Sequence, residues 1–558
     1  MEKQELIEQL NINLKGITDA KVKETILYLF NLIEELSTTN RELQQEIQQL
    51  GDENNRLKGE QGKPKIKANK KEMVEPEDIS SEKERHKGDR RPKRQRATKK
   101  DKIKIDRIEL CEVDKELLPA DAEFKGYERV VVQDLQIATD NIEFKKELYY
   151  SPAKRKSYRG KLPRGYEGEF GPKIKALALI MKNVSNTSEP KILDFFTSFN
   201  IKISSGTLSN ILIKKKEPFH QEKDELFKAG LQSSSYQQMD ETKARVEGKN
   251  YHTHIVCNPF YTAYFSTEHK DRLTTLKILL NNSELKYCLN QQAFTFLGQL
   301  KVAEKYINEL NRLQSDQEFD LNEFDHLLVE NLPSLKKRVK GKILEAAAIA
   351  SYRQRLDFPV VKTLLCDDAP QFKTLTEELA LCWVHDGRHY KKLRPLLPFN
   401  ADKLDQFIEL YWYYYSKLYD YKSSPSPKSA DLLSSEFDQL FSSQTDYQQL
   451  DERILKTKLK KENLLLVLKY PQLPLHNNAS ELAARVLVRK RDVSLHTLSP
   501  EGTKANVTFL SIVQTCKKFG VNAYDFIFDR INHSFNLPPL AQLIEDKSLV
   551  NVIIPSSP

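Results

Sequence analysis

The sequence lacks an apolar run long enough to cross a membrane, and it also lacks a Cys-x-x-Cys pair. Its longest apolar runs fall far short of the roughly 20 residues of a transmembrane helix. The N-terminus has neither the basic start nor the apolar stretch of a signal peptide. Scattered cysteines indicate neither a disulfide framework nor a complete zinc site, so a reducing cytoplasm is the expected compartment. The cysteines are Cys111, Cys257, Cys288, Cys366, Cys382 and Cys516.

Positive charge is concentrated in one place. The net charge is +9, and residues 83–104 hold twelve Lys/Arg against three acids, so the rest of the chain is close to neutral. A concentrated basic run favours a polyanionic partner such as DNA, although a solvated linker is the alternative. We expect Lys93, Arg94 and Arg96 to contact DNA phosphates.

A leucine recurs at every seventh position near the N-terminus, from Leu29 to Leu57. The alternate seam holds Ile33, Asn40, Ile47 and Asn54. Leucine at d with Ile and Asn at a predicts a parallel two-stranded coiled coil over residues 29–57, and hence a homodimer. The alternative is one amphipathic helix that packs on its own domain.

At 558 residues the chain is expected to hold three or more domains. Composition and periodicity predict a mixed α/β multidomain protein. The expected order begins with an N-terminal helix and zipper (1–60), a basic linker (61–104), a small β-rich module (105–165) and a helix-turn-helix region (166–228). An α/β domain (229–500) follows, with a helical insertion at about 272–358 and a helical segment at about 401–468. The last part is a C-terminal region (501–558).

The helix-turn-helix prediction comes from two helical stretches and a capped third one. Residues 173–182 and 190–199 read as helices, and Ser204 begins a third after a short turn. In such a motif the last helix reads base edges in the major groove. Ser205, Thr207 and Asn210 are therefore the expected base contacts.

Three acids lie far apart in sequence at positions that could meet in the fold. Asp240 and Asp367 follow strand-like segments, and Glu481 opens a helical run. Residues 251–256, 262–266 and 379–385 also read as strands. Two carboxylates at strand ends and one on a helix can hold two divalent cations about 3.5–4 Å apart, the arrangement used in phosphodiester chemistry.

The sequence segments around these acids closely resemble those of one family. The segments are Met239-Asp-Glu-Thr, Asp367-Asp-Ala-Pro-Gln-Phe, Cys382-Trp-Val-His-Asp-Gly-Arg-His-Tyr and His476-Asn-Asn-Ala-Ser-Glu-Leu-Ala-Ala-Arg. They are similar to the core signatures of the insertion-sequence-66 family of transposases. The resemblance implies a ribonuclease-H-like catalytic core, with Asp240, Asp367 and Glu481 as a DDE triad. The sequence departs from the family pattern in two ways. The middle module keeps only Cys111, which implies a lost zinc site. The stretch between Asp240 and Asp367 is also longer than usual.

The resemblance also implies cofactors and partners. Carboxylates suit Mg²⁺ or Mn²⁺, and two ions are expected. Arg485 and Arg489 would contact DNA phosphates or pair with Glu481, and Lys490 and Arg491 extend this basic run. Other expected partners are the terminal inverted repeats of a mobile element, target DNA and small accessory proteins, in a bacterial cytoplasm at the nucleoid.

Zinc is disfavoured, because Cys382, His385 and His389 have no fourth partner at suitable spacing. Strand alternation turns Asp368 and Glu241 away from the metals. The leading hypothesis is a transposase that cuts and joins DNA at the ends of a mobile element. The alternatives are a catalytically inactive DNA-binding derivative and a metal-dependent nuclease that cuts without joining.

Overall fold

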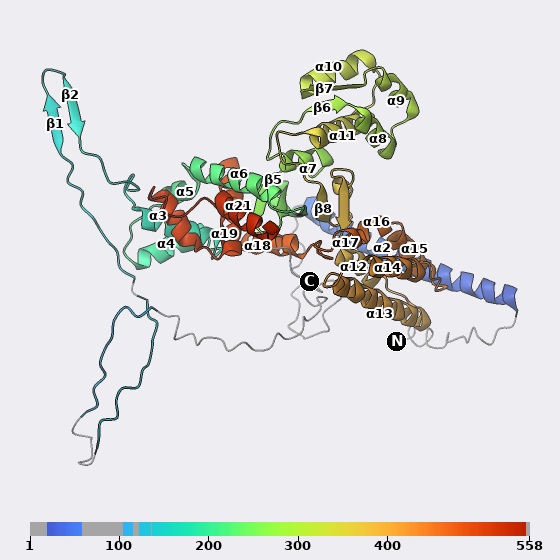
Figure 1. The fold of residues 1–558 in the computed structure, drawn as a ribbon, viewed down its shortest axis with the longest axis horizontal. Helices are drawn as coiled ribbons and strands as arrows, with labels where there is room; N and C mark the ends of the chain where they lie inside the picture. The colour runs from blue at the N-terminus through green and yellow to red at the C-terminus, as the bar shows by residue number, and fades with distance from the viewer. Residues whose placement is uncertain (1–18, 58–103, 115–121, 136, 554–558) are drawn as a thin grey trace.

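The structure is a computed structural model that describes residues 19–57, 104–114, 122–135 and 137–553. It is a mixed α/β protein in which one five-stranded sheet is surrounded by helices from distant parts of the chain (Figure 1). Lys93, Arg94 and Arg96 lie outside the described residues, so their predicted DNA contacts stay predictions. Within the described ranges, no helix is long and apolar enough to span a membrane.

The central sheet has the strand order β5-β4-β3-β8-β9. Strands β3, β4 and β5 form an antiparallel meander. Strand β8 then pairs in parallel with β3, and β9 pairs in parallel with β8. Their bounds are β3 (Tyr236–Val246), β4 (Lys249–Cys257), β5 (Thr262–Thr267), β8 (Thr363–Cys366) and β9 (Glu378–Leu381). The strands that the sequence predicts near Gln238, at 251–256 and at 262–266 are confirmed.

One predicted strand is too long. β9 ends at Leu381, and α12 (Trp383–Lys391) begins two residues later, so the expected strand up to His385 is wrong. Cys382 N–H still donates to the carbonyl of Cys366 at 3.0 Å, but Trp383 N–H donates to Leu475 at 3.0 Å. The backbone therefore leaves the sheet because its next hydrogen-bond partner lies in another segment.

Strand alternation gives the sheet two different faces. Ile255 and Tyr264 lie on one face and pack against Ala483 and Leu487 of α18 (Asn478–Ser494). α19 (Pro500–Phe519) also packs on β5. The opposite face belongs to the largest buried core, which includes Met239, Val256, Phe265 and Leu364 and the helix α6 (Glu217–Gln232).

Two groups of helices interrupt the sheet strands in sequence. The first, between β5 and β8, contains α7 (Arg272–Leu279), α8 (Gln291–Gln299), α9 (Glu304–Asn311), α10 (Leu321–Asn331) and α11 (Lys337–Gln354), with the small antiparallel pair β6 (Tyr287–Leu289) and β7 (Ser315–Phe319). The second, between β9 and α18, contains α12, α13 (Pro398–Tyr421), α14 (Pro427–Leu440), α15 (Gln448–Lys458), α16 (Lys461–Leu464) and α17 (Leu466–Lys469). Figure 1 shows them as separate lobes beside the sheet.

Three helices precede α6 at the positions expected from the sequence. They are α3 (Pro172–Asn183), α4 (Glu189–Ser198) and α5 (Ser205–Ile213). Ser204 caps α5 because its hydroxyl accepts the N–H of Thr207 at 3.1 Å. The chain ends in α20 (Ala523–Ile531) and α21 (Leu540–Ile553), which pack on α3 and α6 respectively.

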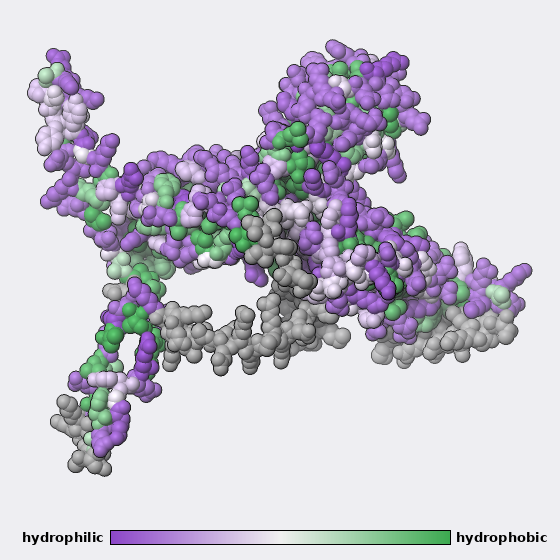
Figure 2. Space-filling model, viewed as in Figure 1, coloured by the Kyte–Doolittle hydropathy of each residue, from purple (hydrophilic) through white to green (hydrophobic). Residues whose placement is uncertain are grey.

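The region of residues 105–165 has little regular structure where it is described. Its strands are β1 (Leu148–Ser151) and β2 (Lys156–Arg159), a hairpin that projects from the body (Figure 1). Apolar side chains gather along the extended chain before it (Figure 2), and Phe124, Tyr127 and Val132 are mostly exposed. The described part of this region therefore forms no core of its own.

The zipper segment is a single helix, α2 (Ala20–Leu57). Leu36, Leu43 and Leu50 are exposed, whereas Phe30 and Glu34 are buried against the second helical group. The leucine seam and the packed face therefore lie on different sides of the helix.

Candidate active site

The pairing register of β3 with β8 places Asp240 and Asp367 next to each other across the sheet. Gln238 of β3 pairs with Leu365 of β8 in parallel. Counting two residues further along each strand gives Asp240 and Asp367, the latter one residue past the end of β8. Adjacent parallel strands lie about 4.8 Å apart, so the two residues lie side by side. Asp240 is within β3 rather than at the strand end that the sequence predicts, because β3 continues to Val246.

Asp240 faces the helix that carries the third acid. In the antiparallel pairing Asp240 lies opposite Ile255, and Ile255 packs against Ala483 and Leu487 of α18. Directly opposite residues share one face of a sheet. The face of β3 that carries Asp240 is therefore the face that α18 covers, with Glu481 in the first turn of that helix.

Asn477 fixes the start of α18 against the first half of β3. Its side-chain N–H donates to the carbonyl of Met239 at 2.7 Å, and its backbone N–H donates to the Cys382 sulfur at 3.2 Å. Its own carbonyl accepts the N–H of Glu481 at 3.2 Å. A single buried amide thus ties Glu481 to the residue before Asp240.

The three carboxylates interact electrostatically. Burial raises the pKa of Asp240 to about 7. The backbone N–H of Glu241, at 2.8 Å, opposes this shift, and the charges of Asp367 and Glu481 add to it. Burial also raises the pKa of Asp367, although the N–H of Ala369 at 3.2 Å stabilises its charged form. Such a set of acids is best stabilised by positive charge placed between them.

Positive charge of the protein reaches the site from α12. Arg388 Nη2 lies 3.2 Å from Glu481 Oε2, and His385 Nδ1 lies 3.6 Å from Glu481 Oε1. Ligand atoms of Cys382, His385 and Glu481 all lie within 4.8 Å of one another. His389, the third residue weighed for zinc, is exposed and is not in this group.

The position of α12 depends on a close contact and a buried carboxylate. A Cβ on Gly387 would lie 2.8 Å from the Trp412 ring of α13, so only glycine permits this approach. Asp386 is 5% exposed, pairs with Arg453 and accepts the hydroxyl of Thr457 at 2.8 Å. These contacts hold the helix that presents His385 and Arg388.

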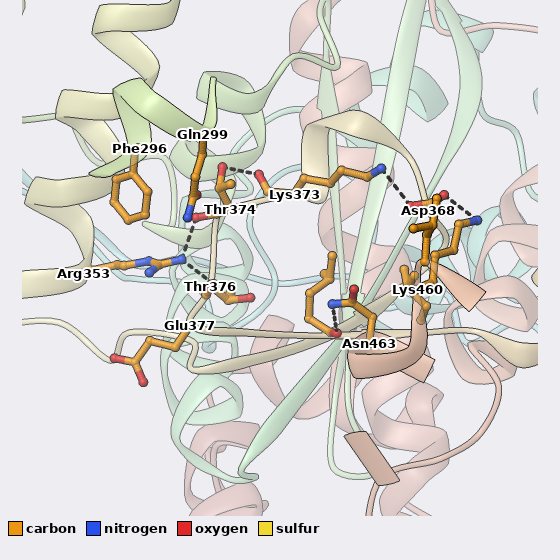
Figure 3. A pocket seen from close by; sticks show the side chains of 13 residues that line it. Phe296, Gln299, Arg353, Asp368, Lys373, Thr374, Thr376, Glu377, Lys460 and Asn463 are labelled. Atoms are coloured by element: carbon orange, nitrogen blue, oxygen red, sulfur yellow. Dashed lines mark hydrogen bonds and ion pairs between the residues drawn. The ribbon is translucent and has the colours of Figure 1, made fainter. Parts of the chain in front are cut away.

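The neighbouring acids have other partners. Asp368 pairs with Lys373 at 3.0 Å and Lys460 at 2.7 Å, and it lines a cavity of about 420 Å³ (Figure 3). These lysines lower its pKa against the opposing effect of burial. Glu241 pairs with Lys270 at 2.6 Å. Each of these two acids therefore has a lysine partner of its own, and their predicted exclusion from metal binding stays a prediction.

Comparison with known proteins identifies the family of the chain. Residues 333–505 match the model of the Transposase IS66 family. The chain is also 31% identical over 321 residues to the uncharacterized protein y4jO of Sinorhizobium fredii, an alignment that covers 57% of this chain and 99% of y4jO. The chain belongs to the IS66 family of transposases. The matched segment holds Asp367, α12 and Glu481, whereas Asp240 lies before it.

The arginines that follow Glu481 differ in their surroundings. Arg489 is exposed, and Arg485 is half-buried. Arg491 donates to the carbonyl of Lys243. Lys490 is 5% exposed and donates to Asn183 Oδ1 at 2.6 Å. Lys490 therefore does not belong to an exposed basic face, and its predicted phosphate contact would require a partner that reaches a buried site.

The predicted base contacts lie on α5. Ser205 and Asn210 are exposed. Thr207 is half-buried, and its hydroxyl lies 2.9 Å from that of Ser204. Two of these three side chains are thus accessible to a partner, while Thr207 helps to close the first turn of the helix.

Sequence reasoning missed Arg388 and Asn477. Arg388 follows His385 by three residues, which is one helical turn, but the sequence predicts a strand that ends at His385, so no shared helical face is expected. Asn477 stands just before the helix that carries Glu481, where Asn is a frequent cap. That position could have marked it, but its partner on β3 is visible only in the fold.

Proposed function

We propose that this transposase-family protein cleaves DNA strands at the ends of a mobile element and joins them to target DNA, with Asp240, Asp367 and Glu481 as a DDE triad. The observation that carries the proposal is the meeting of three carboxylates from β3, the end of β8 and α18. An antiparallel meander followed by two parallel strands, with a helix carrying the last acid, also supports a ribonuclease-H-like core.

The residues fit divalent cations. The three part-buried carboxylates form an all-oxygen donor set, in which the charges of Asp367 and Glu481 help to raise the pKa of Asp240, and Mg²⁺ or Mn²⁺ prefers oxygen ligands. Bound there, two such ions would activate the attacking water or 3′-hydroxyl and stabilise the leaving oxygen.

The chain's own cations have a different role from the ions. Arg388 offsets the charge of Glu481, and His385, whose pKa is lowered by burial, lies beside the same carboxylate. Arg388 is 29% exposed at its side chain, so its guanidinium can also reach a DNA phosphate at the edge of the site. The buried pair Asp386–Arg453 keeps α12 in place while DNA binds and leaves.

DNA binding is assigned to three surfaces. α5 would present Ser205 and Asn210 to base edges of the terminal repeats. The projecting hairpin β1–β2 carries Lys154, Arg155 and Lys156, all exposed, and suits phosphate contacts. The basic run 83–104 would add affinity for any DNA, with a strong dependence on salt.

The proposed active form is a dimer through α2. Leu29, Leu36, Leu43 and Leu50 are 49–60% exposed along one side of a 38-residue helix. A leucine seam with Asn40 and Asn54 in register suits a second copy of the same helix. Such a dimer would bring two active sites to the two ends of one element.

The triad can be tested with shape-preserving variants. Asp240→Asn, Asp367→Asn and Glu481→Gln should each abolish Mg²⁺-dependent cleavage of DNA taken from the flanks of the gene, because each removes charge needed in the transition state. DNA binding in a gel-shift assay should persist. Asp368→Asn is the matched control and should keep most activity.

The same assay separates the alternative functions. Cleavage without strand transfer would identify a nuclease, and binding without cleavage by the wild type would identify an inactive derivative. Cleavage that survives all three triad changes would overturn the proposed site.

A further inference from the structure

A second cavity lies away from the triad, between the proposed DNA-reading helix and the catalytic helix. Its volume is about 510 Å³. Helices α4 and α5, the hairpin of β3 and β4, and helices α18 and α19 contribute its walls. Ser205 and Ser209 line it from α5, and Leu487 and Lys490 line it from α18. Its size falls in the range of small-ligand sites, roughly 300–1,000 Å³.

The cavity contains a buried cation without an anion. Lys490 is 5% exposed, and its ammonium donates to the neutral side chain of Asn183 at 2.6 Å. Asn183 donates to the carbonyl of Leu179 at 2.9 Å, which turns its oxygen toward the ammonium. Within the described part of the chain, no ion pair includes Lys490. A buried ammonium with no counter-charge is costly, and an anion in the cavity would remove that cost.

The surrounding charge also favours an anion. Lys182, Lys243, Arg245 and Arg491 line the same cavity. Glu189 is its acidic lining residue, and it is already paired with Lys182 at 3.6 Å. The lining therefore offers more positive than negative charge to a ligand.

A second unsatisfied group lies on the α19 side. Asn506 lines the cavity, and its side-chain oxygen is buried without a hydrogen-bond partner. Buried amide oxygens in native proteins are normally paired, so this one is available to an N–H donor of a ligand. Leu212, Leu487 and Val507 provide apolar wall between the amide and the ammonium.

We propose that this cavity binds a nucleotide unit, with the phosphate on Lys490 and the base against the apolar wall with an N–H donated to Asn506. A nucleotide combines an anion, a flat apolar body and base N–H donors, which are the three features that the cavity complements. The unit is either a free mononucleotide or a nucleotide unstacked from DNA on α5. The second source rests on the proposed DNA binding by α5.

The site can be tested on the full chain with simple probes. The four deoxynucleoside monophosphates and inorganic phosphate are titrated by isothermal calorimetry. At least one mononucleotide should bind saturably and more tightly than phosphate. Lys490→Met and Asn506→Leu should each weaken it by roughly 10- to 100-fold, the value of a hydrogen bond to a charged or buried group.

The control is Lys504→Met, which removes an exposed lysine of α19 outside the cavity and should leave binding unchanged. Glu481→Gln should also bind mononucleotides normally, so failure of the triad and failure of this site are distinguishable. Equal affinity for phosphate and all mononucleotides, or unchanged affinity in both cavity variants, would overturn the proposal.

A competition experiment identifies the source of the nucleotide. If the unit comes from DNA, mononucleotides should compete with labelled DNA, and Lys490→Met should weaken DNA binding. If it is a free nucleotide, Lys490→Met should lose mononucleotide binding while DNA affinity stays the same.

Discussion

The side-chain amide of Asn477 donates to the carbonyl of Met239 at 2.7 Å, one residue before Asp240. Asn477 is fully buried and stands at the start of α18. The contact therefore links the strand that carries the first acid to the helix that carries the last. Because catalytic groups must be placed within about 1 Å of their working positions, we expect this link to position the proposed triad rather than to take part in its chemistry.

Replacing Asn477 with Ala should separate these two elements slightly. Removing the buried donor should cost about 1–3 kcal/mol in the free energy of unfolding. We expect cleavage to fall by about 100-fold through misplacement of Glu481, with DNA affinity nearly unchanged. Urea denaturation and a cleavage time course measure the two effects. Asn478→Ala, the adjacent asparagine, serves as the comparison, and an equal loss of activity in both variants would contradict a specific role for Asn477.

The buried acid of α12 gives a second prediction. Asp386→Asn leaves Arg453 buried without its counter-charge, and breaking a buried pair from one side costs about 3–5 kcal/mol. The thermal midpoint should fall, and cleavage should fall with it because α12 carries His385 and Arg388. The double variant Asp386→Asn with Arg453→Met should recover part of the midpoint. A double variant as unstable as the single one would show that the pair is not the cause.

Much of the sheet was predictable from local pattern. The meander of β3, β4 and β5 follows from alternating residues, and α5 begins where Ser204 caps it. Asp367 could be placed just after a strand for the same reason, whereas Asp240, expected at a strand end, lies within β3 because that strand continues to Val246. The predictions that succeed each depend on residues within one short segment.

The failures share a different cause. The strand expected to reach His385 becomes a helix after Leu381, because Trp383 is fully buried among aromatic rings of the second helical group. Lys490 lies in an exposed-looking basic run, yet it is buried because α3 packs over it. In both cases a distant segment decides the outcome, and no local pattern reports it.

The contact of α2 with the second helical group predicts how the zipper is anchored. Glu34 is 1% exposed and accepts the N–H groups of Leu396 at 2.8 Å and Leu397 at 2.9 Å, where α13 begins. A carboxylate at a helix N-terminus is favourable for the helix dipole as well. Glu34→Gln should therefore increase hydrogen exchange over residues 396–402, whereas the exposed neighbour Glu35→Gln should not.

The leucine seam should be separable from this anchor. Leu36→Lys with Leu43→Lys should convert the dimer to a monomer in analytical ultracentrifugation, because charges cannot be buried in the seam. Amide hydrogen exchange of residues 396–402 should remain slow in this double variant. Loss of both properties together would mean that the leucines and Glu34 serve one interface, contrary to their different sides of α2.

The last prediction concerns Lys490 and pH. Burial, together with the smaller effect of the nearby charge of Lys182, lowers the pKa of Lys490 to about 7. In the unfolded chain the pKa of a lysine is about 10.4. Between these values the unfolded state binds more protons than the folded state, so the free energy of unfolding should rise with pH from about 7 to 10. Below pH 7 the penalty of the buried charge is fully present.

Lys490→Met removes this dependence. The variant should be more stable than the wild type near pH 7 by an amount on the order of a few kcal/mol, and the difference should shrink as pH approaches 10. The charged groups lining the cavity, which include Glu189, Lys243, Arg245, Arg491 and His496, are common to both proteins, so they cancel in the comparison. Thermal midpoints of wild type, Lys490→Met and the exposed control Lys504→Met at pH 6.5 to 9.5 measure the effect. Parallel curves for wild type and Lys490→Met would show that the ammonium is solvated, and the wild type would then carry no buried charge for an anion to neutralise.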